Sequence, residues 1–309
     1  MANASGKKLN GKSFGARIIK YIWFYIMFIP VFAQLWVFHY WPMAGIRFAF
    51  TKYTPFIQPQ YIGFDNFTRL FNEPRFWSAF NNTLILSIGN LLLSMIFSVG
   101  IALLINEIGN AVAKKFVQTV IYLPHFLSWV VVAAIFTIIL STQGGFVNDL
   151  LVKLGIIDEP IYFMASKDHW RGIWYFINRW KETGWGTIIF LAAITGISPD
   201  LYEAAEIDGA GRLKQTWYIT IPSLMNTILV VFILNLAKVM NVFESVFVLY
   251  NEMVYDVSDV IKTYTYRVGL QNNDYGYSTA VGLFQSVVSL ILVTGANWFS
   301  EKINGRGIV

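Results

Sequence analysis

The sequence contains no cysteine, and only 13% of its 309 residues are Asp, Glu, Lys or Arg. The absence of cysteine excludes disulfides, thiolate catalysis and cysteine-ligated metal sites. The three histidines, His39, His125 and His169, lie too far apart in sequence to suggest a metal site, so we expect packed or interfacial imidazoles. No cluster of acids and bases indicates a catalytic centre, and we predict neither catalytic nor metal-binding residues.

Apolar residues are abundant instead, at 56% of the chain, which is more than the surface of an ordinary soluble domain allows. A lipid bilayer is therefore the expected solvent. The 26 Phe, 16 Tyr and 11 Trp fit aromatic belts at the membrane interfaces. They fit equally well a cavity lined for stacking, and composition does not choose between these.

Long apolar runs predict the spans, because about 20 such residues cross the hydrocarbon core as a helix. The fourth span is less obvious, since its apolar run extends upstream through Arg179, Lys181 and Glu182, which are tolerated where they face protein or water. We predict an all-α membrane protein with about six transmembrane helices, near 19–41, 80–105, 117–140, 174–198, 222–249 and 278–299.

The charge distribution predicts a multi-pass protein with both termini in the cytoplasm. The segments on the two sides of the predicted membrane contain equal numbers of Lys and Arg. On the side that holds the two termini, however, the segments are shorter and the positive charges lie close to the ends of the spans. The expected organisation is a cytoplasmic basic tail over 1–20, a transmembrane domain over 21–299 that begins with an anchored helix rather than a signal peptide, a cytoplasmic elbow over 199–221, and a cytoplasmic tail over 300–309.

The basic tail contains a match to the phosphate-loop pattern, Gly6-Lys7-Lys8-Leu9-Asn10-Gly11-Lys12-Ser13. That pattern binds phosphate only where a strand delivers the loop and a helix receives the phosphates, and neither context is predicted here. We therefore expect no nucleotide and no nucleic acid to bind this chain. Attraction of the tail to anionic lipid headgroups is the expected role.

The elbow between the fourth and fifth spans carries the sharpest local signals. Ser198 is a good N-cap, Pro199 suits the first helical position, and Asp200 complements the helix dipole. Either Gly209 or Gly211 should end this short helix, and a second piece over 212–220 should run to the next span. Such an elbow could dock into another protein, or it could simply close a hairpin.

The elbow resembles the signature of permease subunits in ATP-binding-cassette importers, E-A-A-x-x-D-G-A…I-x-L-P. The matching residues are Glu203, Ala204, Ala205, Asp208, Gly209, Ala210, Ile219 and Pro222. The sequence departs from the family at Ile221, where Leu is usual, and at Thr216, where an aromatic is common. The resemblance implies a type I importer permease fold in which the elbow is the coupling helix. Glu203 would then contact the ATPase, Ala204 and Ala205 would pack against it, and Gly209 would allow the bend.

The same resemblance implies a set of partners. These are a second permease subunit, two ATPase subunits that hold ATP and Mg, an extracytoplasmic solute-binding protein, and the lipid of a bacterial cytoplasmic membrane. The chain itself would need no cofactor and would not be an enzyme. The resemblance is closest to the sugar-uptake group of maltose and multiple-sugar type, through three segments at 61–67, 180–186 and 305–307. A sugar or oligosaccharide is therefore the expected solute.

Candidate residues of a solute pathway come from two sources. Polar residues recur every three or four positions along the predicted fifth span, at Asn235, Lys238, Asn241 and Ser245, with Glu244 beside them. They should face a wet pathway, although hydrogen bonds between helices would also satisfy them. Aligned without gaps from the elbow, the solute-facing positions of maltose-type permeases correspond here to Trp185, Asn235, Lys238, Val239 and Val242.

Two of these candidates suggest a chemistry. Trp185 could stack on a sugar ring, and Lys238 could favour an acidic or heavily hydroxylated oligosaccharide. The alternative function is a secondary transporter driven by an ion gradient. Such a transporter needs ion-coordinating acids within broken spans, and only Glu244 is deep enough in a predicted span to qualify.

Overall fold

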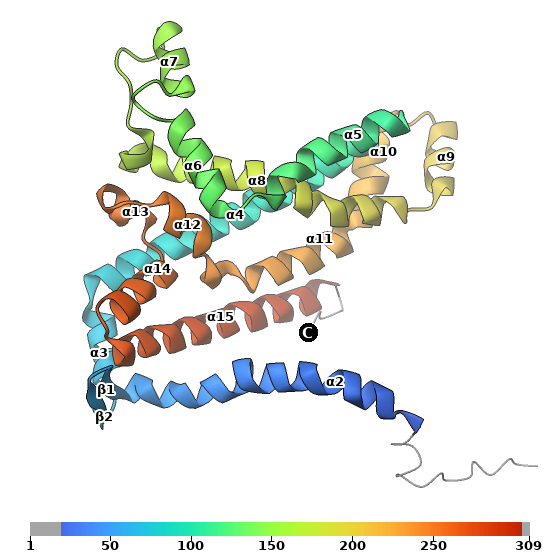
Figure 1. Ribbon diagram of the computed structural model, residues 1–309. Helices are drawn as coiled ribbons and strands as arrows, with labels where there is room; N and C mark the ends of the chain where they lie inside the picture. The colour runs from blue at the N-terminus through green and yellow to red at the C-terminus, as the bar shows by residue number, and fades with distance from the viewer. Residues whose placement is uncertain (1–19, 305–309) are drawn as a thin grey trace, which may run out of the picture.

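The computed structural model describes residues 20–304, which form a bundle of long helices with two short strands at one end (Figure 1). Within these residues, four helices are long and apolar enough to cross a membrane: Ile22–Phe50, Pro74–Asn106, Arg212–Leu236 and Tyr275–Lys302. Two bent pairs, Ala111–Phe126 with Trp129–Ile139 and Lys167–Thr195 with Pro199–Ile207, raise the total to as many as six. The predicted all-α membrane fold is confirmed. Most of the basic tail, with its phosphate-loop pattern, and the segment 305–307 lie outside the described residues.

The elements follow one another along the chain with short connections. They are α2 (Ile22–Leu35), a π turn (Trp36–Tyr40), a 3-10 helix (Trp41–Phe50), β1 (Thr51–Thr54), β2 (Ile57–Tyr61), α3 (Asp65–Asn72), α4 (Pro74–Asn106), α5 (Ala111–Tyr122), α6 (Trp129–Ile139), α7 (Phe146–Lys153), α8 (Lys167–Thr195), α9 (Pro199–Ile207), α10 (Arg212–Gln215), α11 (Ile221–Leu236), α12 (Glu244–Leu249), α13 (Tyr255–Ser258), α14 (Ile261–Tyr266) and α15 (Tyr275–Asn304). The two strands pair antiparallel, with Thr51 opposite Tyr61.

Helices α4 and α8 form the centre of the bundle, and small residues let them approach closely. A side chain at Gly89 would meet the Tyr175 hydroxyl at 2.3 Å, and one at Gly186 would meet Ser98 Oγ at 2.5 Å. Tyr175 also donates a hydrogen bond to the Ile85 carbonyl, at 2.7 Å. Helices in lipid gain little from apolar burial, so close backbone approach and interhelical hydrogen bonds hold such pairs. Helix α2, in contrast, has no buried residue and runs along the edge of the bundle (Figure 1).

The span predicted near 117–140 is a bent pair of helices rather than a straight helix, because the chain bends by 99° between Phe126 and Trp129. Pro124 lacks a backbone N–H and lies in the 3-10 turn Leu123–Phe126, and Ser128 then caps α6 by accepting a hydrogen bond from the Val131 N–H at 3.3 Å. Lys181 Nζ donates to the His125 carbonyl at 2.8 Å. Backbone groups freed by a break within a membrane need such partners.

The span predicted near 222–249 is present, but its helix is interrupted, because α11 ends at Leu236 and α12 begins only at Glu244. No glycine or proline marks this break, which contains the 3-10 turn Val239–Asn241. Gln285 of α15 donates to the Met240 carbonyl at 2.6 Å and to Asn241 Oδ1 at 3.2 Å. A side chain from a distant helix thus satisfies the opened backbone, and local sequence gives no warning of it.

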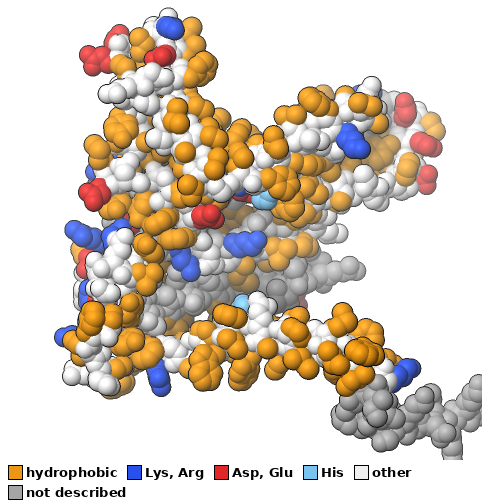
Figure 2. Space-filling view, viewed as in Figure 1, with side chains coloured by type: hydrophobic (Ala, Val, Ile, Leu, Met, Phe, Trp, Pro, Cys, Tyr) orange, Lys and Arg blue, Asp and Glu red, His pale blue; other side chains and the backbone are white. Residues whose placement is uncertain are grey.

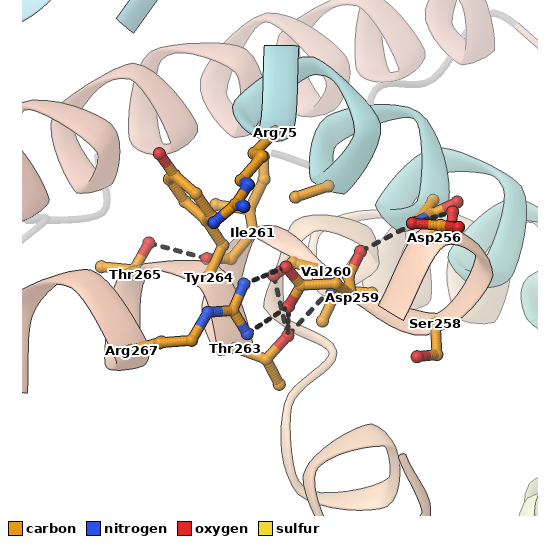
Figure 3. Close-up of polar contacts among 12 residues, drawn as sticks. Arg75, Asp256, Ser258, Asp259, Val260, Ile261, Thr263, Tyr264, Thr265 and Arg267 are labelled. Atoms are coloured by element: carbon orange, nitrogen blue, oxygen red, sulfur yellow. Dashed lines mark hydrogen bonds and ion pairs between the residues drawn. The ribbon is translucent and has the colours of Figure 1, made fainter. Parts of the chain in front are cut away.

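The end of the bundle that carries α13 and α14 is held by a polar network (Figure 3). Asp259, which is buried, accepts two hydrogen bonds from the Arg267 guanidinium and one from Thr263 Oγ1 at 2.7 Å. Burial alone lowers the pKa of Arg267, but the hydrogen bonds and the charge of Asp259 outweigh it, and the pKa lies above its ordinary value. Asn82 of α4 donates to the Asp259 and Asp256 carbonyls, which attaches this loop to the central helices.

Candidate functional site

The predicted elbow is present as a short helix, α9, that stands clear of the bundle at the opposite end from β1 and β2 (Figure 1). It begins at Pro199, as predicted, although the Ser198 side chain makes no capping hydrogen bond. Gly209 has a φ of +74° and is the left-handed stop. The Ala210 N–H bonds the Ala205 carbonyl at 2.8 Å and the Gly209 N–H bonds the Glu206 carbonyl at 3.0 Å, which together make a Schellman ending.

The second part of the elbow differs from the prediction. Instead of a separate piece that ends before Pro222, α10 continues through a π turn (Thr216–Thr220) into α11, and 212–236 form one helix. The Ile221 N–H bonds the Thr216 carbonyl across the π turn, directly before the proline that cannot donate. Consequently, the glycine bend at Gly209 leads straight into a membrane-spanning helix.

The elbow surface is open to a partner. No residue of α9 is buried, and the apolar side chains Leu201 and Ile207 are exposed by 50% and 87%. Glu203, Ala204 and Asp208 are exposed as well, and Ala205 is half-buried. Acidic side chains gather at this tip (Figure 2). Two contacts orient it: Tyr202 Oη bonds Thr220 Oγ1 at 2.9 Å, and Arg212 pairs with Glu107 at 3.4 Å.

The second candidate region is a central cavity of about 470 Å³ between α4, α8 and α11, where the α5–α6 break also reaches. An adjoining cavity of about 190 Å³ shares four of its lining residues, Asn90, Ser94, Asn235 and Lys238. Figure 2 shows basic side chains in the hollow at the centre of the molecule. We refer to the two volumes together as the central cavity.

The structure brings most of the predicted pathway residues to the central cavity. Trp185, Asn235 and Lys238 line the larger part, and Val239 and Val242 line the smaller part. The lining does not include Asn241 or Glu244. Asn241 faces a different cavity beside α15, and Glu244 is exposed at the start of α12. The predicted polar stripe is therefore wrong as one face of a single helix, because the break after Leu236 interrupts it.

One wall of the central cavity is an aromatic pair held by ionic groups. The rings of His125 and Trp185 stack with centroids 4.5 Å apart and planes within 7°. Glu182 bonds His125 Nδ1 at 2.8 Å and pairs with Lys181 at 3.1 Å. Lys181 is buried, and it also donates to the carbonyl at the α5–α6 break. This wall presents the half-exposed Trp185 to the cavity as a flat apolar surface.

The central cavity also contains residues that sequence reasoning missed as site residues: Asn90, Ser94, His125, Arg179 and Glu182. Two signals were available. Ser87, Asn90, Ser94 and Ser98 recur at helical spacing along the predicted second span. Arg179 and Glu182 are charged groups within a predicted span, which mark functional sites by default. Only His125 had no signal in the sequence, because the bend between α5 and α6 is what brings its ring against Trp185.

Known proteins resemble this chain over most of its length. A family model described as the binding-protein-dependent transport system inner membrane component matches residues 91–305. The polygalacturonan/rhamnogalacturonan transport system permease protein YteP of Bacillus subtilis (strain 168) is 41% identical over 306 residues, covering 98% of this chain and 95% of that protein.

Two solved structures are similar over nearly the whole chain. One is a bacterial ATP-binding-cassette transporter involved in the import of the acidic polysaccharide alginate, with a TM-score of 0.87 and 38% identity, covering 95% of this chain and all of that one. The other is the bacterial alginate transporter in complex with its alginate pentasaccharide-bound periplasmic protein, with a TM-score of 0.88 and 39% identity over 96% of this chain and all of that one.

Proposed function

The chain belongs to the family of binding-protein-dependent transport system inner membrane components, and on this premise we propose that it carries an acidic oligosaccharide through the central cavity. The protein is a multi-pass membrane permease of an ATP-binding-cassette importer. Import would proceed by alternating access, with the cavity open to one side of the membrane at a time.

The observation that carries this proposal is the lining of the central cavity. Amide and hydroxyl groups from α4 and α11, including Asn90 and Asn235, face the same volume as the indole of Trp185. Sugars need hydrogen-bonding groups for their hydroxyls and a flat apolar surface for their ring faces. Lys238 adds a positive charge that forms no ion pair within the described part of the chain.

The relatives support an acidic solute. The name of YteP refers to polygalacturonan and rhamnogalacturonan, and the titles of the two structures refer to alginate, one of them calling it an acidic polysaccharide. The combination of a cationic group, amides and an aromatic surface in this cavity fits a sugar chain that bears carboxylates.

The proposed partners attach at opposite ends of the bundle. Two ATPase subunits with ATP and Mg would dock at α9 and at its counterpart in a second permease. Glu203 would be the polar contact, Ala204 and Ala205 would pack against the ATPase, and Gly209, next to Asp208, would allow the bend. A solute-binding protein would dock on the end that carries β1 and β2. This arrangement places the elbow and both termini in the cytoplasm of a bacterial cell. The exposed apolar surface of α9 supports this proposal over a simple hairpin closure.

The alternative, a secondary transporter, is disfavoured by family membership. Its one sequence cue was Glu244, which does not line the central cavity. ATP hydrolysis belongs, in this proposal, to the separate ATPase subunits rather than to this chain.

The test is transport by the complete importer in proteoliposomes. The chain, its partner permease and the ATPase would be reconstituted into vesicles. The binding protein and a labelled oligogalacturonide would be supplied on one side of the membrane, and ATP on the other. We expect uptake that requires ATP and the binding protein and that survives ionophores. Uptake without ATP, or collapse on dissipation of ion gradients, would contradict the importer mechanism. Unchanged uptake in a Lys238→Ala, Trp185→Ala double variant would place the pathway elsewhere.

A further inference from the structure

Among the described residues, Arg179 is the one charged side chain with buried nitrogen atoms that lack a hydrogen-bond partner. It lies near the middle of α8, and the residue is only 8% exposed. Its Nη2 donates to Asn90 Oδ1 at 2.6 Å, but Nε and Nη1 have no hydrogen-bond partner. A guanidinium carries five N–H donors and stays charged, so burial with most of them unused is unfavourable. Such a group points to a missing partner.

The position of Arg179 suggests where that partner comes from. The side chain lines the central cavity together with Asn90 and Lys238. On its other side it lines a lateral cavity of about 530 Å³ whose walls, including Phe97 and Trp180, are mostly apolar. Apolar walls offer no acceptor to a guanidinium. The polar volume toward Lys238 is therefore the side from which an anion would reach it.

The charges around the central cavity favour an anion further. Glu182 is the one carboxylate in its lining, and it is already engaged by Lys181 at 3.1 Å and by His125 at 2.8 Å. Arg179 and Lys238 face the same volume without an ion-pair partner in the described part of the chain. The cavity thus has two cationic groups outside any ion pair, and the carboxylate of Glu182 is already paired with Lys181.

We propose that Arg179, held in place by Asn90, is a specificity-determining residue that receives a carboxylate of the transported sugar. The inference rests on the proposed import of an acidic oligosaccharide and names the group that selects for the acid. Arginine suits this role better than lysine, because its planar donor set matches a carboxylate and is less strongly hydrated. The neighbouring Lys238 is exposed, so it would make the electrostatic potential of the cavity more positive rather than fix the position of the carboxylate.

The test compares acid with ester in the reconstituted importer. Uptake of an oligogalacturonide and of its methyl ester would be measured in the wild type, in Arg179→Gln and in Asn90→Asp, always with the same binding protein. The ratio of the two rates, normalised to the wild type, isolates the contribution of the permease. We expect Arg179→Gln to lower the preference for the acid by about tenfold, mainly through KM for the acid.

Asn90→Asp keeps the size of the side chain and the buried guanidinium, but it places a carboxylate where Arg179 now bonds an amide. Asn90→Asp should lower the preference for the acid as Arg179→Gln does. It provides the same test if Arg179→Gln fails to fold. Arg179→Lys should retain part of the preference. The inference is overturned if Asn90→Asp or a folded Arg179→Gln keeps the wild-type ratio, or if both lower uptake of acid and ester alike. If the wild type transports neither sugar with ATP, it is the proposed function that fails.

Discussion

The elbow and the central cavity differ in how far apart in sequence their parts lie. The elbow is a single stretch, 199–221, and the start of its helix α9 and the glycine bend that ends it are both set by residues next to them in the sequence. The central cavity combines Asn90 of α4 with Trp185 of α8 and Lys238 in the break after α11. The elbow therefore follows from local backbone rules, whereas the cavity depends on how distant helices meet and where they break.

The breaks show this dependence most clearly. The α5–α6 break is held by Lys181 and the break after α11 by Gln285, each from another helix. Moving either break would carry its neighbours, His125 or Lys238, away from the cavity. A packing change should therefore act on the cavity as a whole, while a backbone change at the elbow should act on coupling alone.

The largest effect is expected from Gly184→Ala. A Cβ at Gly184 would lie 2.1 Å from the Ile121 carbonyl oxygen, so α8 and α5 could not keep their distance. Overpacking of this kind costs about 1–3 kcal/mol, and here neither the Cβ, which is fixed by the backbone of α8, nor the backbone oxygen of Ile121 can rotate away. We expect a lower melting temperature in detergent and almost no uptake, measured on the reconstituted importer.

The control for Gly184→Ala lies on the same helix. A Cβ at Gly172 would meet nothing within 4 Å, so Gly172→Ala makes the same chemical change without the clash. It should leave melting temperature and uptake near the wild-type values, helped by the better helix propensity of alanine. Normal uptake by Gly184→Ala would show that the α5–α8 contact does not position the cavity.

The next largest effect is expected at Gly209, with the opposite signature. Its φ of +74° is unfavourable for a β-branched residue, although the space around it is open. Gly209→Val should strain the bend by about 1–2 kcal/mol and reduce coupled uptake by about tenfold, while membrane insertion stays normal and the melting temperature falls less than in Gly184→Ala. ATPase activity and uptake would be measured together, because uncoupling lowers uptake without lowering hydrolysis.

Gly209→Asn is the matched variant, since asparagine tolerates the left-handed conformation better than other non-glycine residues. It should transport within about twofold of the wild type, because its strain is well below the 1.4 kcal/mol of a tenfold change. If valine and asparagine behave alike, side-chain bulk at the ATPase contact matters more than backbone conformation, and the elbow would not be a purely local device.

The same contrast explains what could be read from the sequence. Pro199 and Gly209 predicted the helix start and the bend because both act on their own backbone. The break near Pro124 had a signal in the sequence, the proline itself, but the length of the apolar run predicted a span there all the same. The break after Leu236 had no such signal, since the side chain that supports it, Gln285, comes from another helix. Arg179 lay in view as a charge within a span, but only the structure shows its unpaired donors.

A moderate effect is expected from Trp185→Ala, which removes the flat surface of the central cavity. Aromatic stacking contributes about 0.5–1.5 kcal/mol beyond area burial, so KM for the oligosaccharide should rise about three- to tenfold with little change in the maximal rate. Uptake measured against substrate concentration separates the two. Trp23→Ala, on the exposed face of α2, removes an indole away from the cavity and should leave KM unchanged.

The smallest effect is expected from Glu107→Gln, which removes the ion pair between the elbow and the end of α4. The pair spans 3.4 Å, and its Arg212 side chain is largely exposed to solvent. Exposed pairs contribute about 0–1 kcal/mol, so uptake should stay within about twofold of the wild type. The continuous helix over 212–236 already joins the glycine bend to the membrane, and it transmits movement without this pair. A much larger loss of coupled uptake, with ATPase activity retained, would mean that the elbow also acts through α4, and thereby directly on Asn90 and the central cavity.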